Sequence, residues 1–593
     1  MSIIERAADV AAKAAPPKID KTKRLAHRKT GQYYHWYIIT GVTFGCMVVY
    51  ACSLIRSWYL RRRARNNASP RRSNVISAFR AGLNNMAFNQ PIPLSIYSRS
   101  TPAEWFFTIA YIALTLGLGF RASRFQHTWD YANPMGMVAF AQMPFIVGLA
   151  GRNNALSYLT GISYEKFNYL HRAAGRVCVL TTALHTFGWV KKGLGKHGPG
   201  HEVFTTGVVA AVALLVMFLT SFKFIRARLW EAFMVFHVVF GLMFITAAWA
   251  HWPPFKNWIF PCIILWGFDR LCGVLRLIVL NKWWSLPLRR SKKLPEHTAV
   301  IELVDPNVVR IAFNRPLLKW SPGQHVYLTM PEVATLRYEQ HPFTLASCPD
   351  DTGNAVCIVR AQTGFTRRIV ESISAGTATF RTYVEGPYGM SPDMNHYDSV
   401  VLIAGGTGIT FALSHFLQIV KNVRAGKSAV KSLRLVWNIR QAENVSWIAP
   451  LVNAALSTAI PGLSVRLDAY VTRSAVGGGS DADSPTTLTP TASDEDISEK
   501  TKETSGLAAL AGLNGAAAAI TTFHQGRSDI EHILRHEVAS PAATGPAGGL
   551  GVAVCGPTTL AVDARRAVCK VNTMSAVMKG QPEIGFYSGN FGF

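Results

Sequence analysis

Four histidines, arranged as two pairs with equal spacing, are the residues of this sequence best suited to chemistry inside a membrane. The first pair is His171 and His185, and the second pair is His237 and His251. The members of each pair are 14 residues apart. In an α-helix this is a rise of about 21 Å and nearly four turns, so both histidines of a pair share one helix face. Two facing helices of this kind would present two opposed imidazole pairs, which suits two stacked six-coordinate b-type haems.

The direction of the two helices decides which histidines face each other. The apolar segments that carry the pairs are separated by one further apolar segment, so they run in the same direction. His171 is therefore expected opposite His237 at the inner side of the membrane, and His185 opposite His251 at the outer side. A single histidine in an apolar segment is about as often a packed core residue as a ligand. Two pairs at identical spacing favour the ligand interpretation, because ionisable residues inside membranes are functional by default.

Two short segments in the C-terminal half have side chains that suit a flavin nucleotide. In chain order they supply His341, Pro342, Phe343, Thr344, Gly364, Thr366 and Arg367. The first four open a predicted strand over Phe343–Ser347 and offer a flat imidazole or aromatic wall and a hydroxyl group. The last three begin a predicted helix, where exposed amides, a hydroxyl and a cation fit a pyrophosphate. An ordinary capped helix with a basic first turn is the alternative.

A glycine-rich turn between a strand and a helix predicts a dinucleotide phosphate site. The apolar run Val400–Ala404 leads directly into the turn, and the helical pattern Phe411–Val420 follows. The turn residues assigned to the site are Gly405, Gly406, Thr407, Gly408 and Thr410. Glycines there let backbone amides approach an anion at the positive end of the helix. The turn is not a GxGxxG pattern, and a tight turn without a ligand is the alternative.

A second strand and turn further along the chain resemble a wall beside a nicotinamide ring. The strand is Val552–Val554, and the turn residues are Cys555, Gly556 and Pro557. Arg440, after the predicted strand Leu433–Ile439, and Arg527 are candidates to contact a 2′-phosphate. Such contacts favour NADPH over NADH, although either arginine could equally lie on the surface.

The composition of the chain suits a protein that lies partly in a membrane. Hydrophobic residues make up 49% of the 593 residues and charged residues 16%, a low charge content for a soluble protein. Much of the net charge of +27 lies in basic runs beside apolar segments, such as Arg61–Arg65, Arg226–Arg228 and Arg289–Lys293. This placement is typical of cytoplasmic loops, and no nucleic acid partner is expected because no binding module accompanies the runs. The nine cysteines include no CxxC pair, which argues against a disulfide framework, a zinc site or an iron–sulfur cluster.

Seven apolar stretches are long enough to cross a hydrocarbon core of about 30 Å, which needs about 20 residues per helix. They are Trp36–Trp58, Glu104–Phe120, Pro134–Ala150, Asn168–Val190, Val203–Phe222, Glu231–Trp252 and Trp258–Leu280. The third is the least secure, because it is short and contains Gln142 and Pro144. The basic loops after the first, third, fifth and seventh stretches place those loops on one face, taken as cytoplasmic. The basic N-terminus then lies on the outer face, against the same rule.

The character of the sequence changes from membrane to soluble at about Leu286. Period-2 patterns at Thr298–Val304 and Val309–Phe313 predict a β-rich domain. From His396 the alternation of strand, turn and helix predicts a parallel α/β domain. The stretch from Ser474 to about Ile520 is rich in Gly, Ser, Thr and Ala, and is predicted to be a disordered insertion in a surface loop.

Taken in order, these motifs resemble those of the fungal ferric (metallo)reductase family, the transmembrane branch of the superfamily that also contains the NADPH oxidases. The resemblance extends from about Trp105 to the C-terminus. It rests on the paired histidines, His341–Thr344, Gly364–Ile369, Gly386–Gly389, Gly405–Thr410, Trp437–Arg440, Gly526–Arg527 and Cys555–Pro557.

The resemblance implies a multi-domain fold with an α-helical transmembrane bundle and a ferredoxin-reductase-like module. Residues 1–103 would hold the N-terminal tail, the first span and a cytoplasmic loop, and residues 104–285 the haem-binding spans. An FAD-binding β-barrel would occupy residues 286–395 and an NADPH-binding α/β domain residues 396–593. Phe593 is the expected cover of the flavin, although the tail from Tyr587 to Phe593 lacks the acidic residues usual in the family.

The implied activity is that of a transmembrane ferric-chelate reductase. Electrons from cytosolic NADPH would pass through FAD and two b-type haems to Fe³⁺ on the opposite side, with Cu²⁺ as an alternative acceptor. An NADPH oxidase that makes superoxide is the main alternative, whereas a non-redox seven-span transporter or receptor leaves the cofactor motifs unexplained. Seven spans and the 14-residue spacing of the second pair favour the reductase branch. The family default is the plasma membrane, with the vacuole or another internal membrane as the alternative, and iron or copper uptake transporters are implied partners.

Overall fold

The chain divides into two compact units in the computed structural model. Residues 1–48 and 106–269 form the first unit, and residues 49–105 and 270–593 form the second. The structure describes residues 21–66, 69, 74–88, 101–121, 129–194, 198–283, 297–350, 352–373, 376–472, 512–546 and 548–589.

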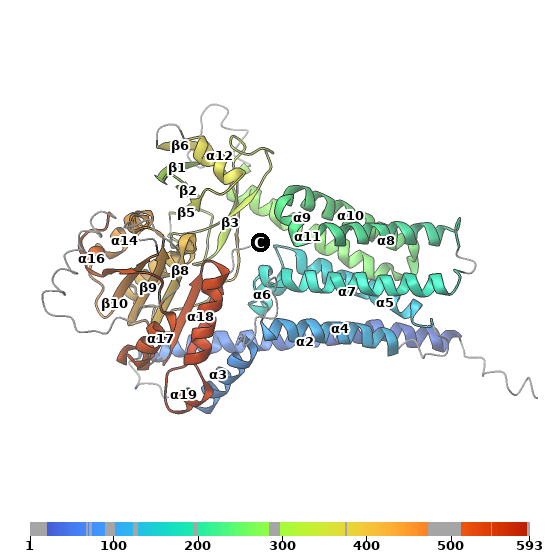
Figure 1. Cartoon of the computed structure of the whole chain (residues 1–593), viewed down its shortest axis with the longest axis horizontal. Coiled ribbons are helices and arrows are strands. Elements are labelled where there is room, and N and C mark those ends of the chain that lie inside the picture. Colours follow the sequence, from blue (N-terminus) through green and yellow to red (C-terminus); the bar gives the residue numbers. More distant parts are fainter. Residues whose placement is uncertain are drawn as a thin grey trace, which may run out of the picture. The chain divides into compact units, whose positions relative to one another are not determined.

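The first unit is a bundle of long helices (Figure 1). The long helices are α2 (Lys21–Arg65), α4 (Pro102–Arg121), α5 (Ala132–Ala150), α7 (Tyr164–Lys191), α8 (Glu202–Thr220), α10 (Trp230–His251) and α11 (Lys256–Leu280). Short helices connect them, namely α6 (Ala155–Thr160), α9 (Lys223–Arg228) and η2 (Pro253–Phe255). Helix α5 packs against α7, and α8 packs against α10. The ends of α2 and α11 continue into the second unit.

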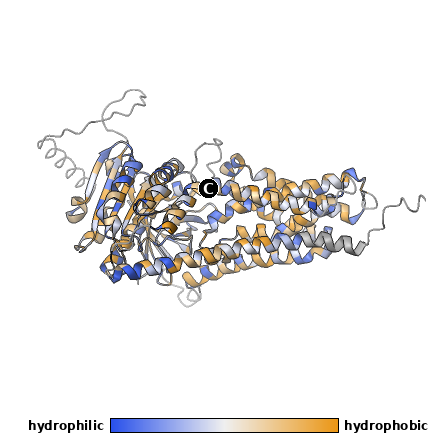
Figure 2. Ribbon diagram, turned by 90° about the horizontal axis from the view of Figure 1, so that it is seen from below, coloured by the Kyte–Doolittle hydropathy of each residue, from blue (hydrophilic) through white to orange (hydrophobic). Residues whose placement is uncertain are grey.

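Five of the described helices are long and apolar enough to cross a membrane. They are the part of α2 from Gln32 to Arg65, α4, α5, α8 and α10, and Figure 2 shows apolar residues along the bundle helices. Helices α7 and α11, with 28 and 25 residues, occupy the other two predicted segments. All seven segments are therefore helical, while their number as membrane spans stays a prediction.

Helix α5 is the most enclosed of the apolar helices, with 72% of its apolar window buried, against 17% in α4, α8 and α10. Its polar residue Gln142 is fully buried. The side-chain amide of Gln142 donates to Thr181 Oγ1 at 3.2 Å, and its Oε1 accepts from the Tyr111 hydroxyl at 3.1 Å. Because these partners satisfy the amide, the polar residue that weakened the third predicted span is compatible with the centre of a helical bundle.

The first part of the soluble region consists of two antiparallel sheets. The strands are β1 (Thr298–Asp305), β2 (Val308–Asn314), β3 (His325–Thr329), β4 (His341–Thr344), β5 (Asn354–Arg360), β6 (Thr377–Arg381) and β7 (Tyr383–Tyr388). One sheet has the order β5-β2-β1-β6 and the other the order β4-β3-β7. The two period-2 patterns correspond to β1 and β2, so the β-rich prediction is confirmed, while closure into a barrel stays a prediction. Strand β4 starts at His341, two residues before its predicted start, because His341 already pairs with Leu328 of β3.

The second part of the soluble region is a six-stranded parallel sheet with helices, as the alternation of strands and helices predicts. Its strands are β8 (Ser399–Gly405), β9 (Ser432–Ile439), β10 (Ser464–Val471), β11 (Thr521–Gln525), β12 (Leu550–Cys555) and β13 (Ile584–Gly589). The helices include α13 (Ile409–Arg424), α14 (Ala449–Leu456), α16 (Gly515–Ala519), α17 (Ile530–Ala539), α18 (Thr558–Val571) and α19 (Met574–Met578). The strand order is β11-β10-β9-β8-β12-β13. Strand β8 is fully buried along its length, as expected for a central parallel strand.

Several predicted features lie partly or wholly outside the described residues. These are the tail before residue 21, the junction between residues 285 and 286, the insertion from residue 474 to 511, and Phe593. Residues 512–520 are folded, because Leu513 and Ala517 are buried and α16 packs on α14. The folded domain therefore resumes before the predicted end of the insertion.

The end of α2 and the short helix α3 (Val75–Phe88) pack on the α/β domain within the second unit. Arg56 on α2 and Arg80 on α3 both form ion pairs with Glu583. Ala78 and Ala81 of α3 form a buried cluster with Val577 of α19. Nothing in the sequence pattern predicts this docking, since neither helix resembles a strand or helix of the α/β alternation.

Candidate functional site

The structure brings the four histidines together in two pairs. The rings of His171 and His237 have centroids 6.0 Å apart, and those of His185 and His251 have centroids 6.1 Å apart. The first member of each pair lies on α7 and the second on α10. Because residues 14 apart on both helices are paired in the same order, α7 and α10 run in the same direction.

Three of the four imidazoles are held by carbonyl groups of neighbouring helices. His171 Nδ1 lies 2.9 Å from the Ile146 carbonyl and His185 Nδ1 2.7 Å from the Ala132 carbonyl, both on α5. His251 Nδ1 lies 2.8 Å from the Val203 carbonyl on α8. Donation by Nδ1 leaves Nε2 of each ring as the nitrogen available to a metal.

Glycines make room for two of these hydrogen bonds. A Cβ atom at Gly136 would lie 2.6 Å from His185 Nδ1, and one at Gly207 would lie 2.9 Å from His251 Nδ1. Each glycine follows its accepting carbonyl by four residues, and a helical side chain covers the turn that precedes it. The sequence therefore carries a signal for the histidine anchors, which the spacing of the histidines alone does not reveal.

The paired imidazoles fit the axial ligands of a haem. A metal–imidazole bond is about 2 Å long, and a ring nitrogen lies about 1 Å from its own centroid, so a metal between two rings separates the centroids by about 6 Å. Both observed separations agree with this value. No three His, Cys, Asp or Glu side chains of the described residues cluster as a metal site.

The predicted flavin segment lies on β4, an edge strand of its sheet that pairs with β3, while β7 forms the opposite edge. The imidazole of His341 stacks on the ring of Phe365 at 4.3 Å with an interplanar angle of 13°. Its Nε2 donates to Glu339 Oε1 at 2.7 Å. Burial raises the pKa of the Glu339 carboxyl, but the hydrogen bond from His341 and the charge of Arg368 outweigh it, so the pKa lies below its ordinary value. The ionised Glu339 carboxylate thus orients the His341 ring, which forms a flat surface with Phe365.

In the second predicted flavin segment, Arg368 rather than the predicted Arg367 pairs with Glu339, the partner of His341. Gly364 precedes α12 (Phe365–Glu371) with φ of +62°, and Thr366 Oγ1 accepts from the Gln362 amide. Arg367 pairs with Glu371 and donates to Asn307. Arg368 instead pairs with Glu339 at 3.1 Å, so it is the arginine of this turn that the structure connects to His341.

An aromatic cluster on the same sheet was not predicted as part of the site. His325 pairs in register with Thr344 on β4 and with Tyr388 on β7. The ring of Tyr327 lies 5.7 Å from that of Tyr388, and the Tyr388 hydroxyl donates to Glu385. By the strand register, His325 and Tyr327 lie on the face of the sheet that carries Thr344, and His341 lies on the other face. Only the Gly386–Gly389 motif hinted at this cluster.

The two predicted nucleotide turns meet at one point of the parallel sheet. Strands β8 and β12 are neighbours, with Ala404 opposite Cys555. A Cβ atom at Gly408 would lie 2.3 Å from the Cys555 carbonyl oxygen, and one at Gly405 would lie 2.8 Å from Pro557 Cδ. Side chains at these positions would force the turns apart. The strand order reverses here, between β8 and β12, and this is where nucleotides bind in open parallel sheets.

Other residues fix the geometry of the turns. The indole nitrogen of Trp437, on β9, donates to the Gly406 carbonyl at 2.9 Å. Thr410 Oγ1 donates to the Thr407 carbonyl at 3.1 Å. Burial raises the pKa of the Cys555 thiol to about 12, so this cysteine is a neutral packing group at the turn rather than a nucleophile.

The two candidate arginines lie at the same edge of the sheet as the turns. Arg440 directly follows β9, Arg527 follows β11, and both are exposed. The Asn438 amide donates to Ser528 Oγ at 2.9 Å, and the Ser528 backbone amide donates back to Asn438 at 3.0 Å. This reciprocal pair connects the end of β9 to the turn after β11, across the intervening strand β10.

The fold and the two glycine turns define a membrane protein that carries a dinucleotide-binding type of α/β domain. Three family models match the chain in succession. Residues 135–248 match the ferric reductase like transmembrane component, residues 294–392 an FAD-binding domain, and residues 397–569 the ferric reductase NAD binding domain. Together these matches show a ferric reductase type of transmembrane region followed by an FAD-binding and an NAD-binding domain.

Several curated relatives are fungal proteins. The chain is 34% identical over 337 residues to a probable cell surface ferric reductase of Aspergillus oryzae, covering 53% of this chain and 44% of the relative. It is 27% identical over 469 residues to ferric/cupric reductase transmembrane component 2 of Saccharomyces cerevisiae, covering 76% and 60%. The chain thus spans less than two thirds of the length of these relatives. A ferredoxin NADP⁺ reductase structure from Neisseria gonorrhoeae aligns with 49% of the chain at 12% identity and a TM-score of 0.29, a score too low to support an argument.

Proposed function

We propose that this protein is a transmembrane ferric-chelate reductase that uses cytosolic NADPH, FAD and two b-type haems. The acceptor is Fe³⁺ on the opposite side of the membrane, with Cu²⁺ as a second substrate. The observation that carries the proposal is the pair of imidazole pairs, at 6.0 and 6.1 Å, in a chain with FAD-binding and NAD-binding domains of the ferric reductase type. Iron and copper are proposed as acceptors because the fungal relatives are named ferric and ferric/cupric reductases.

The histidines would hold the haems by their Nε2 atoms. His171 and His237 would bind the inner haem, and His185 and His251 the outer haem. The carbonyls of Ile146, Ala132 and Val203 keep three of the imidazoles in one tautomer and orientation. When bound, the cofactors supply the redox chemistry, in which a hydride from NADPH is converted into single electrons.

The residues of the soluble domains would bind and orient the nucleotides. His341, Pro342, Phe343 and Thr344 supply a wall and a hydroxyl for the flavin, with Gly364, Thr366 and Arg367 at its pyrophosphate and Phe593 as its cover. The turn residues Gly405–Thr410 expose amides to the NADPH phosphates, and Cys555, Gly556 and Pro557 lie beside the nicotinamide. Arg440 and Arg527 supply positive charge for the 2′-phosphate.

The test is acceptor-dependent NADPH oxidation by membranes that contain the full chain. With an Fe³⁺ chelate the rate should greatly exceed the rate with O₂ as the only acceptor. A reduced-minus-oxidised spectrum should show b-type bands. Equal rates with both acceptors would point to an oxidase instead.

The variant His185→Ala tests whether this histidine is a haem ligand. It should lose the outer haem and nearly all Fe³⁺ reduction, while NADPH oxidation with a soluble dye that accepts from the flavin continues. His201→Ala is the control, because His201 is exposed at the start of α8 and caps that helix. A fully active His185→Ala protein would contradict the proposal.

A further inference from the structure

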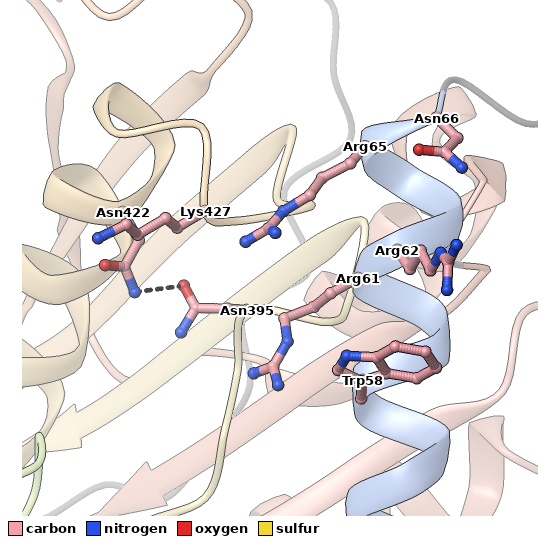
Figure 3. A pocket seen from close by; sticks show the side chains of 8 residues that line it. All are labelled: Trp58, Arg61, Arg62, Arg65, Asn66, Asn395, Asn422 and Lys427. Carbon is pink, nitrogen blue, oxygen red and sulfur yellow. Dashed lines mark hydrogen bonds between the residues drawn. The ribbon is translucent and has the colours of Figure 1, made fainter.

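A basic cavity of about 550 Å³ lies in the second unit, between the end of α2 and the α/β domain. It is lined by Trp58, Arg61, Arg62, Arg65, Asn66, Asn395, Asn422 and Lys427. Figure 3 shows the side chains of Arg61 and Arg65 extending toward Asn395, Asn422 and Lys427 of the α/β domain. The Asn422 amide donates to Asn395 Oδ1 at 3.0 Å, so two of the amides are already ordered.

The cavity carries more positive charge than its surroundings neutralise. Arg61 forms an ion pair with Asp393. The guanidinium of Arg62 lies 5.4 Å from the centroid of the Trp58 ring. Within the part of the chain that the structure describes, no acidic partner is found for Arg62, Arg65 or Lys427. Four cations with one paired carboxylate, beside side-chain amides that can donate, are a site for a phosphate-bearing anion.

This cavity is separate from the dinucleotide site. Asn395 precedes β8, and Lys427 lies between α13 and β9, so both belong to the edge where the parallel strands begin. The glycine turns lie at the opposite edge, where β8 and β12 end. The anion that fits the cavity is therefore not the NADPH of the proposed function.

The position of the cavity along α2 indicates a lipid headgroup. Leu54 and Ile55 are 52% and 65% exposed on the apolar part of this helix, and Trp58 is 54% exposed. Tryptophan is enriched at the boundary between the hydrocarbon core and water. Residues 61 to 65 follow Trp58 by a rise of about 5 to 10 Å, which is about the thickness of the headgroup layer outside the core.

We propose that the cavity binds the headgroup of an anionic phospholipid with more than one phosphate, such as a phosphorylated inositol lipid. Arg61, Arg62, Arg65 and Lys427 bind its phosphates, and its acyl chains lie along the apolar surface of α2. A volume of about 550 Å³ exceeds the need of a single phosphate. The bound lipid bridges α2 and the α/β domain, since it contacts cations from both.

The test measures binding by the purified full chain in detergent, with a fluorescent short-chain phosphatidylinositol bisphosphate as the probe. Unlabelled probe lipid should compete, and phosphatidylcholine should not. Free inositol trisphosphate should compete at least tenfold more weakly, because it lacks the acyl chains. Competition by inositol trisphosphate as strong as that by the lipid would overturn the lipid assignment in favour of a soluble polyanion.

The matched variants are Arg65→Ala and Lys427→Ala, one from each side of the cavity. Each should weaken binding about fivefold, the effect of removing one basic residue from a lipid-binding site. Arg466→Ala is the control, because Arg466 is an exposed arginine on β10 that does not line the cavity. Unchanged binding by both cavity variants would overturn the proposal. The readout is binding rather than reductase activity, so the result does not depend on the proposed function.

Discussion

At the scale of single residues, the histidine pairs depend on small neighbours as much as on the histidines. The carbonyls that accept from His185 and His251 are each followed, four residues later, by Gly136 or Gly207. The carbonyl that accepts from His171 is followed in the same way by Ala150. A larger side chain at these positions would occupy the space of the imidazole. Partners that orient metal ligands typically change metal affinity by about 10- to 100-fold when they are lost.

Gly136→Ala should therefore lower the occupancy of the outer haem. The added Cβ would lie 2.6 Å from His185 Nδ1, so the ring must leave the Ala132 carbonyl. The haem-to-protein ratio should fall from about two toward one, with weakened Fe³⁺ reduction. Gly117→Ala is the control, since a Cβ there meets no atom within 4 Å, and alanine itself favours the helix by about 1 kcal/mol. A full haem content in both variants would argue against the anchor role of the carbonyl.

The two candidate 2′-phosphate residues make a separate prediction about nucleotide choice. Arg440→Ala and Arg527→Ala should each raise the KM for NADPH by about tenfold and leave the KM for NADH nearly unchanged, because only NADPH carries the additional phosphate. The measurement is dye reduction by the full chain with each nucleotide. Equal effects on both nucleotides would assign the arginines to the shared part of the cofactor.

At the scale of elements, many single helices and strands could be predicted from the sequence, but the contacts between distant elements could not. The equal spacing of the histidines and the common direction of their two helices predict which of them meet, because helix periodicity converts spacing into position. The apolar run before Gly405 predicts β8, since a buried parallel strand needs apolar residues on both faces. The order of the six strands, the reach of Glu583 to α3 and the pairing of Arg368 with Glu339 depend on contacts between distant residues, which no local pattern encodes.

One such long-range contact connects β9, β10 and α17. Arg434 lies between two carboxylates, 2.5 Å from Asp468 and 3.1 Å from Glu537, and all three side chains are at most 12% exposed. Burial raises the pKa of Asp468, but the hydrogen bonds from His524 and Arg434 outweigh it and lower the pKa below its ordinary value. The carboxylate therefore stabilises the fold at neutral pH, and this contribution is lost as the pH falls below about 4.

Arg434→Met should destabilise the α/β domain by about 3 to 5 kcal/mol, because two carboxylates would remain buried without their cation. Chemical unfolding of the full chain, followed by intrinsic fluorescence, measures the effect. Arg535→Ala is the control: this exposed arginine pairs with Glu531 one helical turn away, and such pairs contribute about 0.5 kcal/mol or less. A similar small effect in both variants would contradict the buried-pair argument.

At the scale of the whole molecule, buried histidines make the soluble region sensitive to acid. Burial lowers the pKa of His415 to about 3, although Asp393 raises it somewhat. Burial likewise lowers the pKa of His396 to about 4, with Arg56 and Arg61 lowering it further and Asp393 opposing them. Both groups take up protons in the unfolded chain at about 6.5. Their neutral forms therefore favour the folded state above that pH, and stability falls as the pH drops below it.

His415→Leu should reduce this acid sensitivity. Each such histidine contributes a slope of about 1.4 kcal/mol per pH unit below pH 6.5, so removing one should flatten the dependence of the melting temperature on pH between 6.5 and 5. Leucine fits the apolar surroundings of α13, where His415 Nε2 has no hydrogen-bond partner among the residues that the structure describes. An unchanged pH dependence would show that His415 is not buried in its neutral form.

The contacts of Arg56 and Arg80 with Glu583 have a consequence for the order of biosynthesis. Arg56 and Glu583 are 527 residues apart in the chain, so the ribosome delivers the membrane helix long before the acid that it binds. At about 5 to 20 residues per second, roughly half a minute to two minutes separates the two. During that interval the cationic end of α2 is present without this carboxylate, and the contact forms only after Glu583 has been synthesised. A chain truncated before Glu583 would therefore leave Arg56 and Arg80 without this shared carboxylate.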